Sequence, residues 1–159
     1  MKLGFVIPTY PGEKRVALLP DHVNSFENEL IVEKGFGSAL NIDDGRYEEK
    51  GCKMAGREEI FSSCDAVFCL KLLQEPDYKY LRKGQMIIGW THPTGSGTSF
   101  YQNVAVKKGL KIVDLDNIYP TIHERDRHIP IPFIKKNFIW KNSFYAGVAS
   151  VQHALLHFG

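Results

Sequence analysis

The chain has 159 residues, of which 43% are hydrophobic and 24% are charged, and its formal net charge is +2. This composition is typical of one folded domain and excludes disorder over most of the chain. The small net charge gives no basic excess for nucleic-acid binding, and the apolar runs are too short for a membrane-spanning helix or a signal-peptide core.

Short apolar runs alternate with longer amphipathic ones, which is the pattern of strands separated by helices. The short runs predict strands, the third of them weakly, at 2–7, 30–34, 52–54, 65–72, 85–90 and 110–115. Capping residues and periodicity predict helices at 18–29, 43–51, 56–63, 76–84, 99–109 and 142–158, the last capped by Asn142 or Ser143. The segment 116–137 has three prolines, many charges and no period, and is predicted to be irregular.

This alternation predicts an α/β fold with parallel strands joined by right-handed crossovers. The strands 65–72 and 85–90 are apolar on both faces, as expected when helices cover both sides of a sheet. We therefore expect an open, mostly parallel sheet of about five strands, with a Rossmann-like or flavodoxin-like architecture. The last helix has an apolar face that needs a packing surface on this domain, on a second domain or on a second subunit: Val148, Val151, Leu155 and Phe158. This exposed face favours self-association, so we expect a homo-oligomer.

The cysteines Cys52, Cys64 and Cys69 form no paired motif. We therefore expect reduced, buried thiols in a cytoplasmic protein. The pair His153 and His157 is spaced to suit a metal on a helix, but no third ligand is evident, so no metal site is predicted. The mixed-charge run 123–128 is expected to be a solvated loop.

Candidate site residues follow from the rule that ligands of open α/β sheets bind beyond the carboxyl ends of the strands. Arg15 follows the first strand, Lys71 ends the fourth, His92 follows the fifth and Asp116 follows the sixth. Together they suit a 2-oxo acid. Arg15 would bind the carboxylate, Lys71 and His92 would bond the carbonyl oxygen, and His92 would donate a proton.

Each of these residues also has an ordinary structural interpretation. Lys71 could extend from its strand end into water, and His92 could bond a backbone carbonyl. Arg15 could be a surface residue, and Asp116 could orient His92 or Lys71 or simply cap the next segment. The segment 94–99 contains Gly-x-Gly between a strand and a helix, so it could contact a phosphate or be a flexible loop.

The chain resembles the N-terminal part of the alanine dehydrogenase/pyridine nucleotide transhydrogenase family. The resemblance covers nearly the whole chain and rests on segments 2–20, 30–37, 65–97, 112–116 and 136–159. Two stretches, WTHPTGSG and KNSFYAG, are similar to the branch of the family that makes N5-(carboxyethyl)ornithine. That branch implies reductive condensation of pyruvate with the side-chain amine of ornithine or lysine, with NADPH as the reductant.

The resemblance also implies roles for individual residues. Arg15 falls on the arginine that binds the substrate carboxylate, Lys71 on the lysine that bonds the pyruvate-type substrate, and His92 on the catalytic histidine. Asp116 falls where alanine dehydrogenases have a glutamate, and Ser143 falls on a serine near the cofactor phosphates. These positions agree with those found from the strand ends.

The resemblance implies that residues 1–137 form a substrate-binding domain and that 138–159 form a connecting helix. That helix would lead to a dinucleotide-binding domain that is missing here, so we expect the isolated chain to be truncated and inactive. Two alternatives stay open. One is a stand-alone, non-catalytic module for small-molecule binding or oligomerisation, and the other is a domain of the alanine or saccharopine dehydrogenase type.

Overall fold

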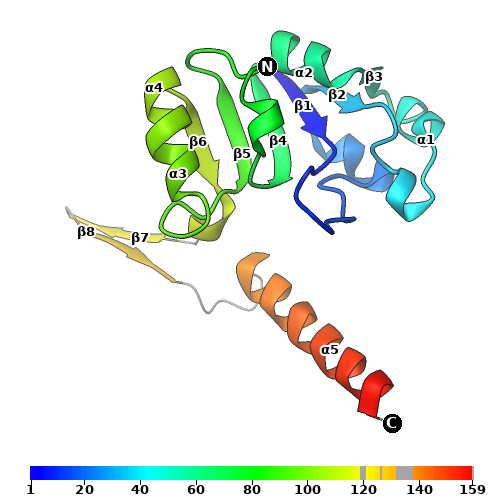
Figure 1. Cartoon of the computed structure of the whole chain (residues 1–159), viewed down its shortest axis with the longest axis vertical. Coiled ribbons are helices and arrows are strands. Elements are labelled where there is room, and N and C mark those ends of the chain that lie inside the picture. The colour runs from blue at the N-terminus through cyan, green and yellow to red at the C-terminus, as the bar shows by residue number, and fades with distance from the viewer. Residues whose placement is uncertain (119–120, 126, 132–137, 159) are drawn as a thin grey trace. The chain divides into compact units, whose positions relative to one another are not determined.

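The computed structural model describes residues 1–118, 121–125, 127–131 and 138–158. The chain forms two compact units, Met1–Leu115 (unit 1) and Asp116–Gly159 (unit 2). Unit 1 holds a parallel sheet with its helices, and unit 2 holds a hairpin and a long helix (Figure 1).

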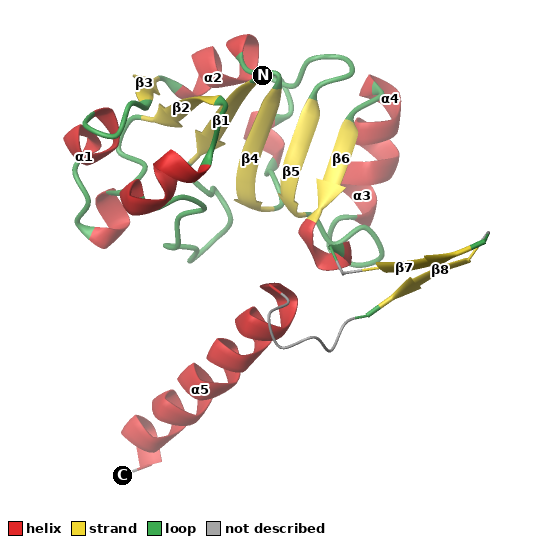
Figure 2. Ribbon diagram, turned by 180° about the vertical axis from the view of Figure 1, so that it is seen from behind, coloured by secondary structure: helices red, strands yellow, loops and turns green. Residues whose placement is uncertain are grey.

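Unit 1 is built on a sheet of six strands in the order β3-β2-β1-β4-β5-β6, with every neighbouring pair parallel. This is the Rossmann order, so the predicted open parallel α/β sheet is confirmed, with six strands rather than about five. Figure 2 shows β4, β5 and β6 pointing toward the same edge of the sheet. The strands are β1 (Lys2–Val6), β2 (Glu29–Glu33), β3 (Lys53–Ala55), β4 (Ala66–Lys71), β5 (Met86–Trp90) and β6 (Lys111–Asp114).

Helices cover both faces of the sheet, as predicted. Successive side chains of a strand point to opposite faces, so Phe5 and Val6 of β1 belong to different core clusters. One cluster packs Val6 under α2 (Arg57–Ser63) and the helical segment 98–108. The other packs Phe5 with Tyr47 of α1 (Asp44–Glu48).

Two of the predicted helices in unit 1 are confirmed by their ends. The side chain of Asp43 accepts a hydrogen bond from the Gly45 amide and caps α1. The helical segment 98–108 stops at Gly109, whose backbone is left-handed. This segment consists of α3 (Thr98–Phe100), a π-helical stretch (Tyr101–Ala105) and α4 (Val106–Lys108).

Two other predicted helices are wrong. The segment 18–29 forms only a 3-10 helix, Pro20–Ser25, because Asn24 and Ser25 are poor helix formers and Glu29 already starts β2. The segment 76–84 is helical only in the single turn Glu75–Asp77.

Unit 2 corrects the prediction that 116–137 is irregular. After a short 3-10 helix at Leu115–Asn117, β7 (Thr121–Glu124) pairs antiparallel with β8 (Arg127–Pro130). The run 123–128 therefore spans a hairpin turn, while 132–137 lie outside the described residues. The segment lacks the alternation of apolar and polar residues that predicts a strand. The two strands nevertheless form because the turn sets the register in which their backbones pair.

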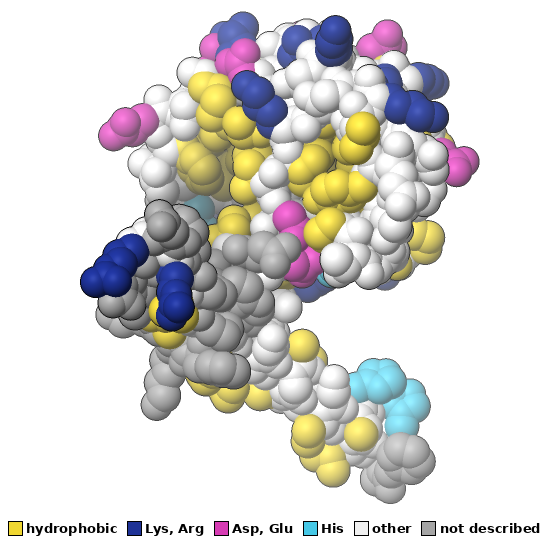
Figure 3. All heavy atoms as spheres, turned by 90° about the vertical axis from the view of Figure 1, so that its left-hand side faces the viewer, with side chains coloured by type: hydrophobic (Ala, Val, Ile, Leu, Met, Phe, Trp, Pro, Cys, Tyr) yellow, Lys and Arg dark blue, Asp and Glu magenta, His cyan; other side chains and the backbone are white. Residues whose placement is uncertain are grey.

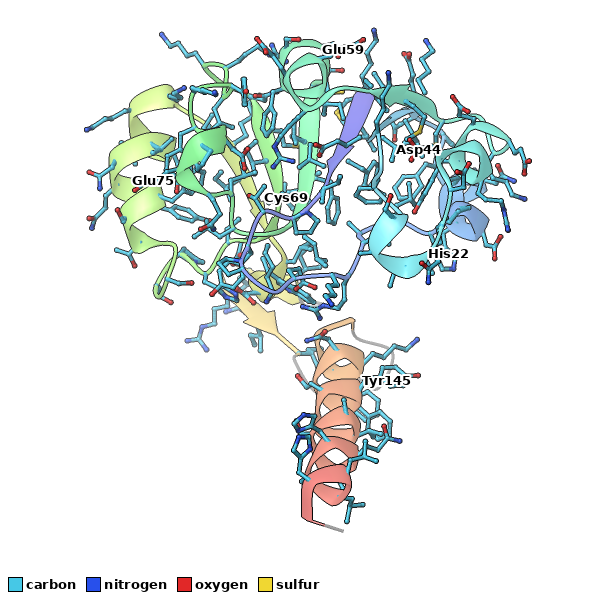
Figure 4. The ribbon with its side chains drawn as sticks, turned by 45° about the vertical axis from the view of Figure 1, so that its right-hand side comes forward. His22, Asp44, Glu59, Cys69, Glu75 and Tyr145 are labelled. Carbon is cyan, nitrogen blue, oxygen red and sulfur yellow. The ribbon has the colours of Figure 1, made fainter. Side chains whose placement is uncertain are left out.

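The long helix α5 runs from Phe138 to Phe158. Asn142 and Ser143 therefore lie inside it, which corrects their prediction as caps. Apolar side chains are exposed along it, among them Tyr145, which projects from the helix in Figure 4, and Leu155. None of the helices in the described ranges is both long and apolar enough to cross a membrane. That α5 leads to a further domain stays a prediction.

Candidate functional site

Trp90 brings two of the predicted substrate-binding residues together at the carboxyl edge of the sheet. The Lys71 Nζ lies 5.1 Å from the centroid of the Trp90 ring, and the Arg15 Cζ lies 5.6 Å from it. Both distances are typical of cation–π contacts. Trp90 is buried and ends β5, so the ring fixes two positive charges beside the strand end that leads to His92.

A bulge in β4 aims Lys71 at this ring. Phe68 pairs with Ile88, but the next pair is Lys71 with Trp90, so β4 has one residue more than β5 between them. The extra residue turns Lys71 to the face that carries Trp90, whereas regular alternation would put it on the other face. Gly89 permits this geometry because a Cβ there would run into the Cys69 carbonyl oxygen.

Arg15 is held by Glu13, which sequence reasoning missed. The Glu13 carboxylate accepts from Arg15 Nε at 2.8 Å and from Nη2 at 2.6 Å, and it also accepts the Arg15 backbone N–H at 2.9 Å. The side chain of Glu13 is only 7% exposed, against 54% for Arg15. Arg15 therefore covers a carboxylate that lies beneath it.

Hydrogen bonding within this pair shifts both groups toward their charged forms. The side-chain hydrogen bonds from Arg15 lower the pKa of Glu13, and the charge of Lys71 adds to that effect. The same hydrogen bonds raise the pKa of Arg15. The site thus contains a partly covered carboxylate beside two cations, which leaves it with one net positive charge for an anionic ligand.

His92 follows β5 in a left-handed backbone conformation, with φ of 46°. A residue other than glycine adopts this conformation at a cost on the order of 1 kcal/mol, so neighbouring contacts must hold it. The His92 carbonyl accepts the amides of Gly95 and Gly97, both at 3.0 Å. Gly97 fits only as glycine, because a Cβ there would run into the Thr91 carbonyl oxygen.

These contacts assign a role to the Gly-x-Gly segment 94–99. Two of its amides face the His92 carbonyl, and Thr98 donates its hydroxyl to the Pro93 carbonyl at 3.0 Å. The segment therefore forms the tight turn that follows the catalytic-histidine candidate. This use of its amides supports the structural interpretation over phosphate binding.

A partly buried ion network, also missed from the sequence, fixes the chain between β1 and the site. Arg57 of α2 binds Asp77 through Nε at 2.7 Å and Nη2 at 2.9 Å, and binds Glu33 of β2 through Nη1 at 2.7 Å. Nη1 also donates to the Ile7 carbonyl at 3.0 Å, and Thr9 donates to Asp77 at 3.1 Å. The network therefore ties down the segment that continues to Glu13 and Arg15.

Burial and charge act against each other in this network, with different outcomes at Glu33 and Arg57. Burial raises the pKa of Glu33 despite the nearby guanidinium and a hydrogen bond from the Ile7 amide at 2.7 Å. Burial also opposes the charge on Arg57, but hydrogen bonds to Asp77 and the charges of both carboxylates outweigh it and raise the pKa of Arg57.

Cys69 is buried in the interior of unit 1 (Figure 4). Burial raises the pKa of its thiol to about 12. Cys52 and Cys64 are likewise free and buried. Among the described residues no group of three or more potential metal ligands occurs, and the rings of His153 and His157 stack on each other on α5 with their centroids 4.2 Å apart.

Asp116 and Ser143 belong to unit 2. Asp116 is half-buried in the short helix after β6, and Ser143 is exposed on α5. Their proposed contacts with substrate and cofactor stay predictions. At the end of β6 itself, Asp114 accepts hydrogen bonds from the Thr91 backbone N–H and hydroxyl, so this aspartate contacts the residue that precedes His92.

A Rossmann-ordered sheet with a polar cluster at its carboxyl edge is the arrangement in which open α/β domains generally bind their ligands. The family model for the alanine dehydrogenase/PNT N-terminal domain matches residues 8–129. The chain therefore belongs to the alanine dehydrogenase/PNT family and spans its N-terminal domain.

Curated relatives agree with this assignment. The chain is 54% identical over all 159 residues to N(5)-(carboxyethyl)ornithine synthase of Clostridium botulinum, covering 100% of this chain and 50% of the relative. It is 52% identical over its whole length to the enzyme of that name from Lactococcus lactis, covering 51% of the relative. The chain thus spans about half the length of these relatives. Alanine dehydrogenase 1 of Staphylococcus aureus is 33% identical over 88 residues, 54% of this chain and 23% of the relative.

Solved structures share the fold. The transhydrogenase of Sinorhizobium meliloti superposes with a TM-score of 0.66 at 21% identity, covering 77% of this chain and 35% of that one. An L-alanine dehydrogenase gives the same TM-score at 19% identity, covering 80% and 34%. The expected likeness to the N-terminal domain of alanine dehydrogenases is therefore confirmed at the level of the fold.

Proposed function

We propose that unit 1 is the substrate-binding part of an N5-(carboxyethyl)ornithine synthase that condenses pyruvate reductively with ornithine or lysine. The observation that carries this proposal is the placement of Arg15 and Lys71 over Trp90, at the strand end that leads to His92. The 54% identity to the Clostridium botulinum synthase supports this substrate class over that of an alanine dehydrogenase.

Arg15 binds the pyruvate carboxylate in this proposal. A guanidinium has five N–H donors in a planar fork, and Glu13 bonds those on Nε and Nη2. The substrate carboxylate would bind the remaining edge of the fork or replace Glu13. Trp90 holds the guanidinium from the other side and limits the directions in which it can present these donors.

Lys71 and His92 act on the carbonyl carbon. The Lys71 ammonium donates to the ketone oxygen and draws electron density from the carbon that the substrate amine attacks. The product of that attack is a carbinolamine. His92 gives its proton to the carbinolamine oxygen as the C–O bond breaks, the nitrogen lone pair forms the C=N bond, and water leaves.

Reduction of the resulting imine needs a hydride donor, which in the proposed enzyme is NADPH. The described residues do not fit a dinucleotide cradle, because the amides of Gly95 and Gly97 already face the His92 carbonyl. No hydride-transfer step is therefore assigned to unit 1. Contact between Ser143 and the cofactor phosphates remains a prediction, as does the inactivity of this chain alone.

Assembly and location are part of the same proposal. We expect a cytoplasmic homo-oligomer, and the observation that supports self-association is the exposed apolar surface of α5. The side chains of Tyr145, Val151 and Leu155 are each more than 60% exposed there, and apolar atoms are visible along this helix in Figure 3. Light scattering of the chain beside a Val151→Glu, Leu155→Glu variant tests this expectation.

Calorimetric titration tests the proposed function. Pyruvate and N5-(carboxyethyl)ornithine are titrated into the chain, into Arg15→Ala and into the control Arg46→Ala, which removes an exposed arginine of α1. We expect binding by the wild type and the control and a loss of binding in Arg15→Ala. Binding that survives in Arg15→Ala, or an absence of binding in the wild type, contradicts the proposed site and favours a non-catalytic module.

A further inference from the structure

Thr91 is one of three buried polar residues in the described part of the chain, and it lies directly before His92. The other two have roles in packing: Asp77 binds Arg57, and Gln85 donates to the carbonyls of Phe61 and Cys64. Thr91 is 2% exposed and directs its polar atoms toward the end of β6 instead. A buried hydroxyl requires hydrogen-bond partners, so the partners of Thr91 indicate the structural role of this side chain.

The partners of Thr91 form a directed chain that ends on a carboxylate. Asp114 Oδ1 accepts both the Thr91 backbone N–H at 3.1 Å and the Thr91 hydroxyl at 2.8 Å. The Tyr101 hydroxyl lies 2.7 Å from Thr91 Oγ1. Since the single hydroxyl proton of Thr91 goes to Asp114, Tyr101 donates its proton to Thr91. Backbone and side chain of Thr91 are thus fixed by one aspartate oxygen.

This chain of bonds and the glycine turn hold His92 from both sides. On the carboxyl side, Gly95 and Gly97 donate to the His92 carbonyl. On the amino side, Asp114 fixes the peptide of Thr91. A left-handed residue between two anchored segments cannot relax toward the extended conformation without breaking one of the anchors.

We propose that Asp114, acting through Thr91, is a positioning residue that holds His92 in its left-handed conformation and thereby aims the imidazole at the substrate. This inference deepens the proposed function and rests on it for the catalytic meaning of His92. Its structural part concerns the conformation of His92 alone. Asp116, which the sequence offered as a residue that could orient His92 or Lys71, stays a separate prediction.

The experiment compares three substitutions in the 159-residue chain. Asp114→Leu removes the acceptor, and Asp114→Asn keeps a carbonyl oxygen in the place of Oδ1. Gln85→Leu is the matched control, because Gln85 precedes β5 and Thr91 follows it, so both variants remove buried hydrogen bonds at the ends of one strand. If Asp114→Leu does not fold, Thr91→Val removes the hydroxyl and keeps the backbone bond.

The readouts are the imidazole resonances of His92 and the affinity for pyruvate. The chain has six histidines, so a His92→Gln variant assigns the resonances. We expect Asp114→Leu to move the His92 signals and to weaken pyruvate binding about tenfold, the equivalent of one charged hydrogen bond. Asp114→Asn should restore both, and Gln85→Leu should lower stability alone.

Unchanged His92 signals in Asp114→Leu, or signals that move equally in Gln85→Leu, overturn the positioning role. Failure of the wild type to bind pyruvate overturns the proposed function instead, and the His92 signals still decide the positioning role in that case.

Discussion

The Glu13 carboxylate accepts two hydrogen bonds from the Arg15 guanidinium, from Nε at 2.8 Å and from Nη2 at 2.6 Å. This is the bidentate geometry that a substrate carboxylate would use. The protein therefore carries its own carboxylate on the residue proposed to bind one. Glu13 keeps Arg15 oriented against Trp90 before any ligand arrives, and a ligand must share or displace this contact.

The ion pair predicts a stability difference that depends on pH. A carboxylate whose pKa is lowered on folding stabilises the protein above its unfolded pKa, and this contribution is lost as the pH falls through the folded value. Because Arg15 is half exposed, we expect Glu13→Gln to cost about 1 kcal/mol or less at pH 7 and nothing in acid. Urea unfolding of the wild type and Glu13→Gln from pH 7 down into acid measures this loss of stability, and Glu48→Gln is the control. A cost that does not change with pH contradicts the assignment.

The partly buried network of Arg57, Glu33 and Asp77 predicts a larger effect on stability. Arg57→Leu leaves the carboxylates of Glu33 and Asp77 without their shared cation and should lower the free energy of unfolding by about 3–5 kcal/mol. Arg46→Leu, at an exposed arginine, should stay within about 0.5 kcal/mol of the wild type. Chemical denaturation gives both values, and equal losses in the two variants would show that the network does not stabilise the fold.

The turn after His92 predicts different outcomes for two neighbouring glycines. Gly97→Ala places a Cβ against the carbonyl oxygens of Thr91 and His92 and should cost about 1–3 kcal/mol and disturb the His92 resonances. At Gly95 the nearest atom to an added Cβ is the His92 carbonyl oxygen at 3.9 Å, so Gly95→Ala should leave the stability and the His92 resonances unchanged. Thermal unfolding and the imidazole spectrum test the pair. The reverse order of effects would contradict the described turn.

Much of this arrangement could be predicted from the sequence because strand order fixes which chain segments meet. Arg15, Lys71 and His92 follow or end strands that are adjacent in a parallel sheet, and the structure places the first two on Trp90. Glu13 could not be predicted, because its fold-back onto Arg15 depends on the turn that starts at Tyr10. Arg57, Glu33 and Asp77 come from three elements whose contact is a product of the folded core. The bulge that aims Lys71 leaves no periodic signal in the sequence.

Cys69 predicts resistance to alkylation. Because burial raises the pKa of its thiol to about 12, the folded protein holds it as an unreactive thiol at mildly alkaline pH. Iodoacetamide at pH 8.5 should leave Cys69 unmodified in the native protein and modify it fully in urea, as read by peptide mass spectrometry. Rapid native labelling would show that the interior around Cys69 opens readily. As the pH rises above 9, thiolate formation on unfolding should lower stability.

The central claim is that Arg15, Lys71 and Trp90 form the binding site for a 2-oxo acid beside His92. A pyruvate titration that follows the indole N–H resonance of Trp90, assigned with Trp90→Phe, tests it most directly. We expect a saturable shift of this resonance that is abolished by Arg15→Ala and weakened by Lys71→Met. The proposed site would be contradicted by a Trp90 resonance that does not move in the wild type. It would also be contradicted by a shift that is as large in Arg15→Ala and Lys71→Met as in the wild type.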